Sequence, residues 1–158
     1  KNKFLTPRLK MRSHIKSYGV VPYLVKDDNI KILLCKSVAS KDKWGCLKGT
    51  KNSKESAYEC AKREFLEESS IDVDVALFEN YFEQINIDKD VGVWLVNANN
   101  IENLEQYFLE DTLKNSYLSW ENSKVKFFPL NNLPRIKNKQ ITLIKEIKDF
   151  LKNKNLHH

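Results

Sequence analysis

The hydrophobic positions of the first hundred residues fall into short runs separated by polar turns. Residues 17–25 and 30–36 are largely apolar and flank a turn-like stretch, KDDN, which predicts a β-hairpin. Residues 81–87 and 91–98 flank a second polar turn, DKD, and predict another hairpin.

Other segments show strand-like or helical spacing. Residues 71–78 alternate between apolar and polar, and residues 124–130 are typical of a last strand. A helix is expected from about Ser53, its N-cap, to Ser69, because no Gly or Pro interrupts this stretch. Two further amphipathic patterns use Ile101, Leu104, Phe108, Leu113 and Tyr117, and then Ile141, Ile144, Ile147, Phe150 and Leu151. Mixed strands with few helices indicate α/β layers rather than strict βαβ repeats.

The length and composition predict one globular domain. The chain has 158 residues, of which 41% are apolar, and it contains no internal repeat. We expect a domain at 17–153, preceded by a basic segment, 1–16, and followed by a tail, 154–158, that ends in a tag remnant. That interpretation leaves His14 as the only native histidine and excludes a His-rich metal site.

Cysteine usage and hydropathy bear on location. Three cysteines without a C-x-x-C pair are typical of free buried thiols in a reducing compartment. The sequence contains no run of eighteen apolar residues, so we expect no membrane span, and we expect no secretory leader. These features predict a cytoplasmic protein with no membrane partner.

The net charge of +6 is unevenly distributed. Residues 1–16 carry six Lys or Arg and no acid, and residues 135–158 carry seven against two acids. The acidic centre therefore lies between basic ends. These ends are either solvated tails or a rim that attracts a polyanionic substrate.

Residues 53–69 carry an acidic patch when placed on a helical wheel. Glu64, Glu67 and Glu68 fall within an arc of about 100°. Tyr58, Ala61, Phe65 and Leu66 occupy the neighbouring arc and are expected to face a core. Like charges at this spacing cost only about 0.2–0.5 kcal/mol per pair, so a solvated acidic face is the alternative.

The spacing of the whole segment argues for more than a solvated face. It fits G-x5-E-x7-R-E-(apolar)-x-E-E, with Gly49, Glu55, Arg63, Glu64, Phe65, Glu67 and Glu68. In this pattern the chain resembles the Nudix hydrolase family, which implies an α/β/α sandwich with a mixed β-sheet. One departure is Ser70, where the family has the glycine that most easily adopts a left-handed conformation.

The resemblance implies the chemistry of the site. Diphosphate cleavage in the family uses Mg²⁺ or Mn²⁺, hard cations that prefer carboxylate oxygens. Glu64, Glu67, Glu68 and the backbone carbonyl of Lys48 are the implied metal ligands, with Glu67 and Glu68 in the catalytic set. Arg63 is expected to orient the glutamates.

Two further glutamates of the segment have expected structural roles. Glu59 lies one turn before Arg63 and could share it. Glu55 falls on the far side of the wheel, so we expect it to act near the loop.

A glutamate outside the motif completes the catalytic set. Family members place one in a loop before the last strand, as general base or further metal ligand, and Glu121 in SWEN stands there. The alternative is that SWEN is only a turn.

The residues before the motif bear on the substrate. KWGCLKG resembles the W-x-x-P-K-G entry of relatives that act on dinucleoside polyphosphates, RNA 5′ ends or diphosphoinositol phosphates, with Leu47 in place of Pro. Lys36 and Lys48 are predicted phosphate contacts, or else solvated lysines. Trp44 either stacks on a base or belongs to the core.

Together these features predict a Mg²⁺-dependent pyrophosphohydrolase. Its substrate would be a nucleoside polyphosphate: a dinucleoside polyphosphate, an NTP or an RNA 5′ end. The alternative is a catalytically silent Nudix-like module that binds a nucleotide or RNA. The intact glutamate set argues against that alternative. The oligomeric state is open.

Overall fold

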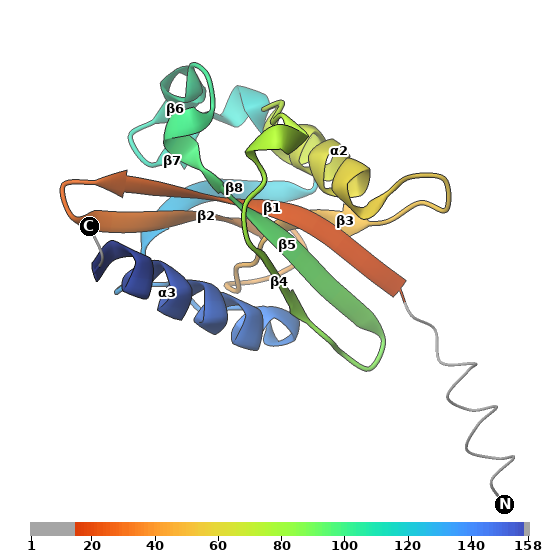
Figure 1. Cartoon of the computed structure of the whole chain (residues 1–158). Coiled ribbons are helices and arrows are strands. Elements are labelled where there is room, and N and C mark those ends of the chain that lie inside the picture. The colour runs from red at the N-terminus through yellow and green to blue at the C-terminus, as the bar shows by residue number, and fades with distance from the viewer. Residues whose placement is uncertain (1–14, 157–158) are drawn as a thin grey trace, which may run out of the picture.

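A mixed β-sheet runs through the part of the chain that the computed structural model describes, residues 15–156 (Figure 1). The strand order is β4-β5-β1-β2-β8-β7-β6, and β3 pairs with β1. The β1–β5 pairing is parallel and the other pairings are antiparallel. The strands are β1 (Ile15–Lys26), β2 (Asn29–Ser37), β3 (Leu47–Thr50), β4 (Tyr81–Gln84), β5 (Lys89–Asn97), β6 (Phe108–Leu109), β7 (Thr112–Leu113) and β8 (Asn122–Pro129).

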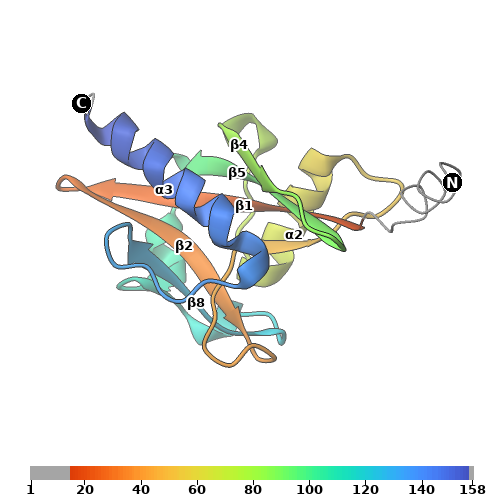
Figure 2. The same ribbon diagram turned by 90° about the horizontal axis from the view of Figure 1, so that it is seen from below.

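Helices cover both faces of the sheet. Helix α2 (Ala57–Ser69) lies on one face and α3 (Ile141–Leu156) crosses the other, as Figures 1 and 2 show. Alternation along β1 supplies both interfaces: Val20 belongs to the core that contains Phe65 of α2, and Val21 to the core that contains Ile144 of α3. This arrangement confirms the expected α/β/α sandwich with a mixed sheet.

Both predicted hairpins are present. Asp27 and Asp28 connect β1 to β2 with φ of 52° and 66°, a left-handed pair that suits a tight two-residue turn. Strands β4 and β5 pair antiparallel.

Helix α2 begins later than expected. Its N-cap is Ser56, not Ser53: the Ser56 hydroxyl accepts a hydrogen bond from the Glu59 amide, and the Glu59 carboxylate accepts one from the Ser56 amide. This reciprocal capping box satisfies two amides at the helix start and fixes that start. The expected inner face was also partly wrong, because Tyr58 and Leu66 are 48% and 42% exposed.

The expected helix at 101–118 is absent. The segment forms short 3-10 turns and the β6–β7 hairpin, with left-handed residues at Asn103 (φ 57°) and Glu110 (φ 58°) that interrupt a helix. Its apolar residues still pack on the core, since Leu104 and Leu113 are buried. The 3-10 turns of the chain are Val75–Leu77, Ala98–Asn100, Leu104–Tyr107, Asn115–Tyr117 and Asn138–Gln140.

Helix α3 confirms the expected C-terminal helix, with one change of face. Leu143, Ile144, Ile147 and Leu151 are buried, whereas Ile141 is 50% exposed. Between residues 15 and 156, no helix has the length and apolar character needed to cross a bilayer. The predictions for the first fourteen residues, including most of the basic segment and His14, and for the tag remnant at 157–158 lie outside the described residues.

Ser70 stands where the family has glycine, and its left-handed backbone conformation should cost a measurable free energy. It ends α2 with φ 67° and ψ 8°, and its hydroxyl donates to the Tyr117 carbonyl at 3.0 Å. Ser70→Gly loses this bond but relieves the left-handed strain, whereas Ser70→Ala loses the bond and keeps the strain. We expect the glycine variant to exceed the alanine variant by roughly 1 kcal/mol in unfolding free energy. Urea denaturation of both variants measures this difference, and equal stabilities would contradict it.

Candidate active site

The site begins where β3 meets α2. Gly49 of β3 lies so close to Glu64 that a Cβ added at this glycine would overlap the Glu64 carboxylate. The Cys60 thiol donates to the Gly49 carbonyl at 3.4 Å and binds the same strand to the preceding turn of the helix. The glycine of the motif is therefore explained by close approach, because any larger residue would displace the carboxylate.

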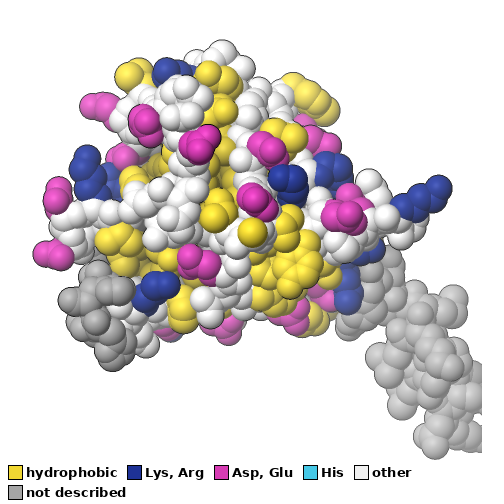
Figure 3. Space-filling view, turned by 45° about the horizontal axis from the view of Figure 1, so that its top comes forward, with side chains coloured by type: hydrophobic (Ala, Val, Ile, Leu, Met, Phe, Trp, Pro, Cys, Tyr) yellow, Lys and Arg dark blue, Asp and Glu magenta, His cyan; other side chains and the backbone are white. Residues whose placement is uncertain are grey.

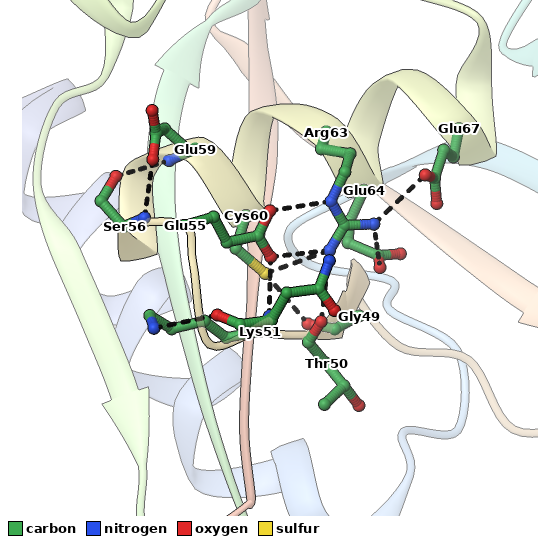
Figure 4. Close-up of polar contacts among 11 residues, drawn as sticks. Gly49, Thr50, Lys51, Glu55, Ser56, Glu59, Cys60, Arg63, Glu64 and Glu67 are labelled. Atoms are coloured by element: carbon green, nitrogen blue, oxygen red, sulfur yellow. Dashed lines mark hydrogen bonds and ion pairs between the residues drawn. The ribbon is translucent and has the colours of Figure 1, made fainter.

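Arg63 connects the glutamates of the motif (Figure 4). Its Nε and Nη2 donate to the two Glu55 oxygens at 2.9 and 2.8 Å, and Nη1 donates to Glu64 at 2.9 Å and Glu67 at 3.2 Å. A further bond reaches the Thr50 carbonyl at 3.2 Å. The guanidinium hydrogen bond holds the pKa of Glu55 down to about 2. Arg63 thus contacts two of the three glutamates among the predicted metal ligands, consistent with the expected orienting role.

The partners of Arg63 differ from part of the expectation. Glu59 does not share Arg63, because its carboxylate caps the helix. Glu55 precedes α2, so the helical wheel, which assumes helix from residue 53, gives it the wrong position. Its carboxylate accepts from the Asn52 amide at 2.9 Å and holds Arg63 from the loop side.

Glu68 is the most buried carboxylate of the motif. It is 8% exposed, and its Oε1 accepts from the Asn122 side-chain amide at 3.4 Å, with the Cys35 thiol at 4.0 Å. Burial raises the pKa of Glu68 to about 8, and Glu64 and Glu121 add to that rise. Burial also raises the pKa of Glu64. The loss of hydration of the buried Glu68 carboxylate is only partly offset by these hydrogen bonds, so this carboxylate is suited to bind a cation.

Glu121 lies beside this carboxylate. A cavity of about 310 Å³, here called the carboxylate pocket, is lined by Glu68, Glu121, Asn122, Lys48, Lys137, Cys35, Cys46, Ser37, Val38, Ala39 and Trp120. The Glu121 backbone carbonyl accepts from the Val38 amide at 2.8 Å, which fixes its segment, while the side chain is exposed. The fold thus brings Glu121 and the helix glutamates together, and whether Glu121 is base or ligand stays a prediction.

Lys48 and Lys36 have different surroundings. Lys48 pairs with Gly19 across β1 and β3 and lines the carboxylate pocket. The Lys36 ammonium lies 5.6 Å from the Trp44 ring centroid. Trp44 itself is 9% exposed and packs edge-on against Phe128 at 4.7 Å, which favours the core alternative.

The donor atoms fit a hard divalent metal. Glu64, Glu67 and Glu68 offer only carboxylate oxygens, and Glu68 is buried without a full partner. Within residues 15–156, no three acidic, cysteine or histidine side chains form a ready set of metal ligands. Glu64 and Glu67 are instead hydrogen-bonded to Arg63, which Glu55 anchors independently.

Sequence reasoning did not identify Asn122 and Lys137. Asn122 follows Glu121 directly, but nothing in its neighbours indicates that it reaches a glutamate on the helix. Lys137 lies 89 positions after Lys48, and only the fold shows that both line one cavity.

Chemistry rather than size assigns the site. A cavity of about 530 Å³, larger than the carboxylate pocket, lies between the β1–β2 hairpin and the segment after β5, with Leu24, Ile101, Phe108 and Phe127 in its wall. None of the predicted catalytic or metal-binding residues lines it. The face that brings α2 and β6–β7 forward has acidic and basic side chains interspersed with hydrophobic ones (Figure 3). No single sign of charge dominates that face.

Comparison with known proteins establishes the family. The NUDIX domain model matches residues 16–150. With this match, the sandwich fold and the glutamate motif, the chain belongs to the Nudix hydrolases, which act on phosphoric anhydrides. The resemblance inferred from the motif is confirmed. None of the curated proteins matches the chain.

Solved structures share the fold at low identity. A Caenorhabditis elegans Ap4A hydrolase in a binary complex is 22% identical, with a TM-score of 0.63 over 88% of this chain and 98% of that one. A NUDIX hydrolase from Nitrosomonas europaea is 18% identical, with a TM-score of 0.62 over 89% and 71%. A MutT protein from Methanosarcina mazei Go1 is 20% identical, with a TM-score of 0.58 over 90% and 97%.

The burial of Glu68 predicts a pH-dependent stability in the metal-free protein. Its pKa of about 8 in the folded protein exceeds the ordinary glutamate value of 4.5. The folded state therefore binds more protons between these values, and stability falls as pH rises through this window. Glu68→Gln removes this contribution, so its melting temperature in EDTA should gain on the wild type from pH 5 to pH 8.5.

Thermal denaturation of the two proteins across that range gives the measurement. Comparing them at each pH cancels the titration of other groups. A constant difference between them from pH 5 to pH 8.5 would show that Glu68 is not buried as described.

Proposed function

We propose that this protein is a Mg²⁺- or Mn²⁺-dependent pyrophosphohydrolase that cleaves a diphosphate linkage in a nucleoside polyphosphate. The observation that carries the proposal is the buried Glu68 carboxylate, which lines one cavity with Glu121 and Lys48 and whose pKa is raised further by the nearby charge of Glu64. Oxygen donors in this number suit a hard metal bound to phosphate. The fold shared with a protein described as an Ap4A hydrolase supports a dinucleoside polyphosphate among the substrates, and an NTP or an RNA 5′ end has the same chemistry.

We assign the following roles to the residues of the site. Glu64, Glu67, Glu68 and the Lys48 carbonyl would hold the metal, which when bound neutralises phosphate charge and lowers the pKa of a water ligand. Arg63, anchored by Glu55, orients Glu64 and Glu67. Asn122 positions Glu68 through its amide.

The reaction needs one proton acceptor. A water oxygen forms a bond to one phosphorus as the anhydride P–O bond breaks, and the bridging oxygen leaves on the second phosphoryl group. Glu121, exposed at the mouth of the carboxylate pocket, accepts the proton of the attacking water. On the substrate side, Lys48 and Lys36 contact phosphate oxygens. The Trp44 ring lies against the Lys36 ammonium.

Three free cysteines, all buried, support a reducing location, and we place the protein in the cytoplasm. Identification of the nucleotide and phosphate products formed from a nucleotide panel, with Mg²⁺ and with EDTA, tests the activity. Tight nucleotide binding without any metal-dependent product would instead identify the silent binding module.

Loss of a ligand charge should abolish turnover while the fold survives. Glu64→Gln and Glu68→Gln should each lower kcat by about 10²-fold or more, because a carboxylate of the shared metal site becomes a neutral amide. Glu146→Gln is the matched control, since Glu146 is exposed on α3 on the other face of the sheet. Steady-state kinetics with circular dichroism measure both properties, and near wild-type turnover in the two site variants would exclude the metal assignment.

Glu121→Gln separates the two roles proposed for this residue. A general base predicts that kcat falls by about 10²–10⁴-fold with the Mg²⁺ concentration for half-maximal activity unchanged. A metal ligand predicts that this Mg²⁺ concentration rises as well. Titration of activity with Mg²⁺ distinguishes them, and an unchanged rate at saturating metal would mean that SWEN is only a turn.

A further inference from the structure

Five lysines converge on a pocket next to the carboxylates. This lysine pocket, about 290 Å³, is lined by Lys43, Lys48, Lys89, Lys137 and Lys139 together with Val91, Asn138 and Gln140. No acidic side chain of the described residues 15–156 lines it. Lys48 and Lys137 also line the carboxylate pocket, so the two cavities adjoin. The lysines come from four separate parts of the chain, and only the fold assembles them.

Hydrogen bonds fix one side of the lysine pocket to the strand that carries the site. The Lys137 amide donates to the Trp44 carbonyl at 3.0 Å. The side chain of Gln140, 2% exposed, accepts from the Cys46 amide at 2.7 Å. Lys137 is therefore fixed beside the segment that leads into Lys48.

A second set of bonds fixes the same lysine-rich segment to the β4–β5 hairpin. The Gln84 side chain donates to the Asn138 carbonyl, and the Asn86 side chain donates to the Lys139 carbonyl, both at 3.2 Å. The segment is thereby brought against Lys89 at the start of β5. These amide contacts fix the backbone of the segment whose lysines, Lys137 and Lys139, line the pocket.

Mutual repulsion of these lysines is weakly compensated. The pKa of Lys89 is lowered, first by burial and then by the charges of Lys48 and Lys139. Asp88 forms an ion pair with Lys139 at 2.6 Å. Like charges gathered around a partly buried ammonium cost free energy unless an anion binds between them.

We propose that the lysine pocket binds the distal phosphates of the substrate, so that the enzyme selects chains of three or more phosphates. The proposal rests on the function proposed above: the bond to be cleaved lies at the carboxylates, and the rest of the chain extends past Lys48 and Lys137 toward Lys89. A single diphosphate at the carboxylates meets Lys48 and Lys137, which both line the carboxylate pocket. A longer chain gains the remaining lysines as point-charge contacts.

The kinetic test compares two substrates. We expect Lys43→Gln combined with Lys89→Gln to lower kcat/KM for diadenosine tetraphosphate by about tenfold, because two partly exposed charge contacts that lie outside the carboxylate pocket are removed. The same variant should change kcat/KM for ADP-ribose less than twofold. Lys152→Gln is the matched control, because it removes an exposed lysine near the C-terminal end of α3, whereas Lys139 precedes the start of this helix. Lys43→Arg combined with Lys89→Arg should keep the selectivity that the two glutamine substitutions remove, because both positive charges are retained.

A binding measurement in EDTA tests the pocket without turnover. Wild type and the Lys152→Gln control should bind inorganic tripolyphosphate more tightly than pyrophosphate by calorimetry, and the double variant should lose this preference. The preference should also shrink near 1 M salt, where the screening length is about 3 Å. A protein that hydrolyses nothing but shows this binding pattern would refute the proposed function and keep the lysine pocket. Equal losses on both substrates, an effect of Lys152→Gln equal to that of the double variant, or tripolyphosphate binding that the double variant retains would overturn the proposal.

Discussion

Helix α2 packs against the sheet along an edge that combines apolar and acidic side chains, and the site depends on this contact. Phe65 and Ala61 are fully buried beneath the helix, while Glu64 and Glu68 lie at the border of the same interface. Burial of the apolar residues positions the carboxylates as a consequence, because residues three and four apart share one side of a helix. The helix cannot move outward to hydrate Glu68 without exposing Phe65.

Arg63 makes this arrangement tolerable in the absence of a metal. Its guanidinium bonds to three carboxylates from two sides, and only Glu55 among them belongs to the loop. Two parallel hydrogen bonds to Glu55 fix the Arg63 guanidinium. Glu64 and Glu67 can therefore exchange Arg63 for another partner while Arg63 stays in place. Glu68 instead accepts hydrogen bonds from neutral groups, the Asn122 amide and the Cys35 thiol, and burial raises its pKa to about 8.

The lysines of the lysine pocket are brought together in a different way from the glutamates of α2. The glutamates come from one helix, and their proximity follows from local spacing. The lysines come from the loop before β3, from β3, from the start of β5 and from the segment before α3. Buried amides, above all Gln140, connect these parts. The tertiary fold therefore gathers the lysines, whereas the spacing of one helix gathers Glu64, Glu67 and Glu68.

The sequence by itself determined the features that depend on local periodicity and turn chemistry. The spacing from Gly49 to Glu68 identified the family and the helix glutamates, and the Asp27–Asp28 turn marked the first hairpin, because both depend on neighbours within a few residues. The helix start was missed because Ser53 and Ser56 are both good caps, and only the Glu59 capping box distinguishes them.

The tertiary structure decided what depends on distant contacts. Apolar spacing at 101–118 satisfied a helical pattern, yet left-handed turns at Asn103 and Glu110 let the same residues pack as a short hairpin. The partner of Glu68, Asn122, lies 54 residues away, and Lys137 reaches the site through a bond to Trp44. Such contacts form when strands and loops from separate regions meet, and no local pattern encodes where that meeting occurs.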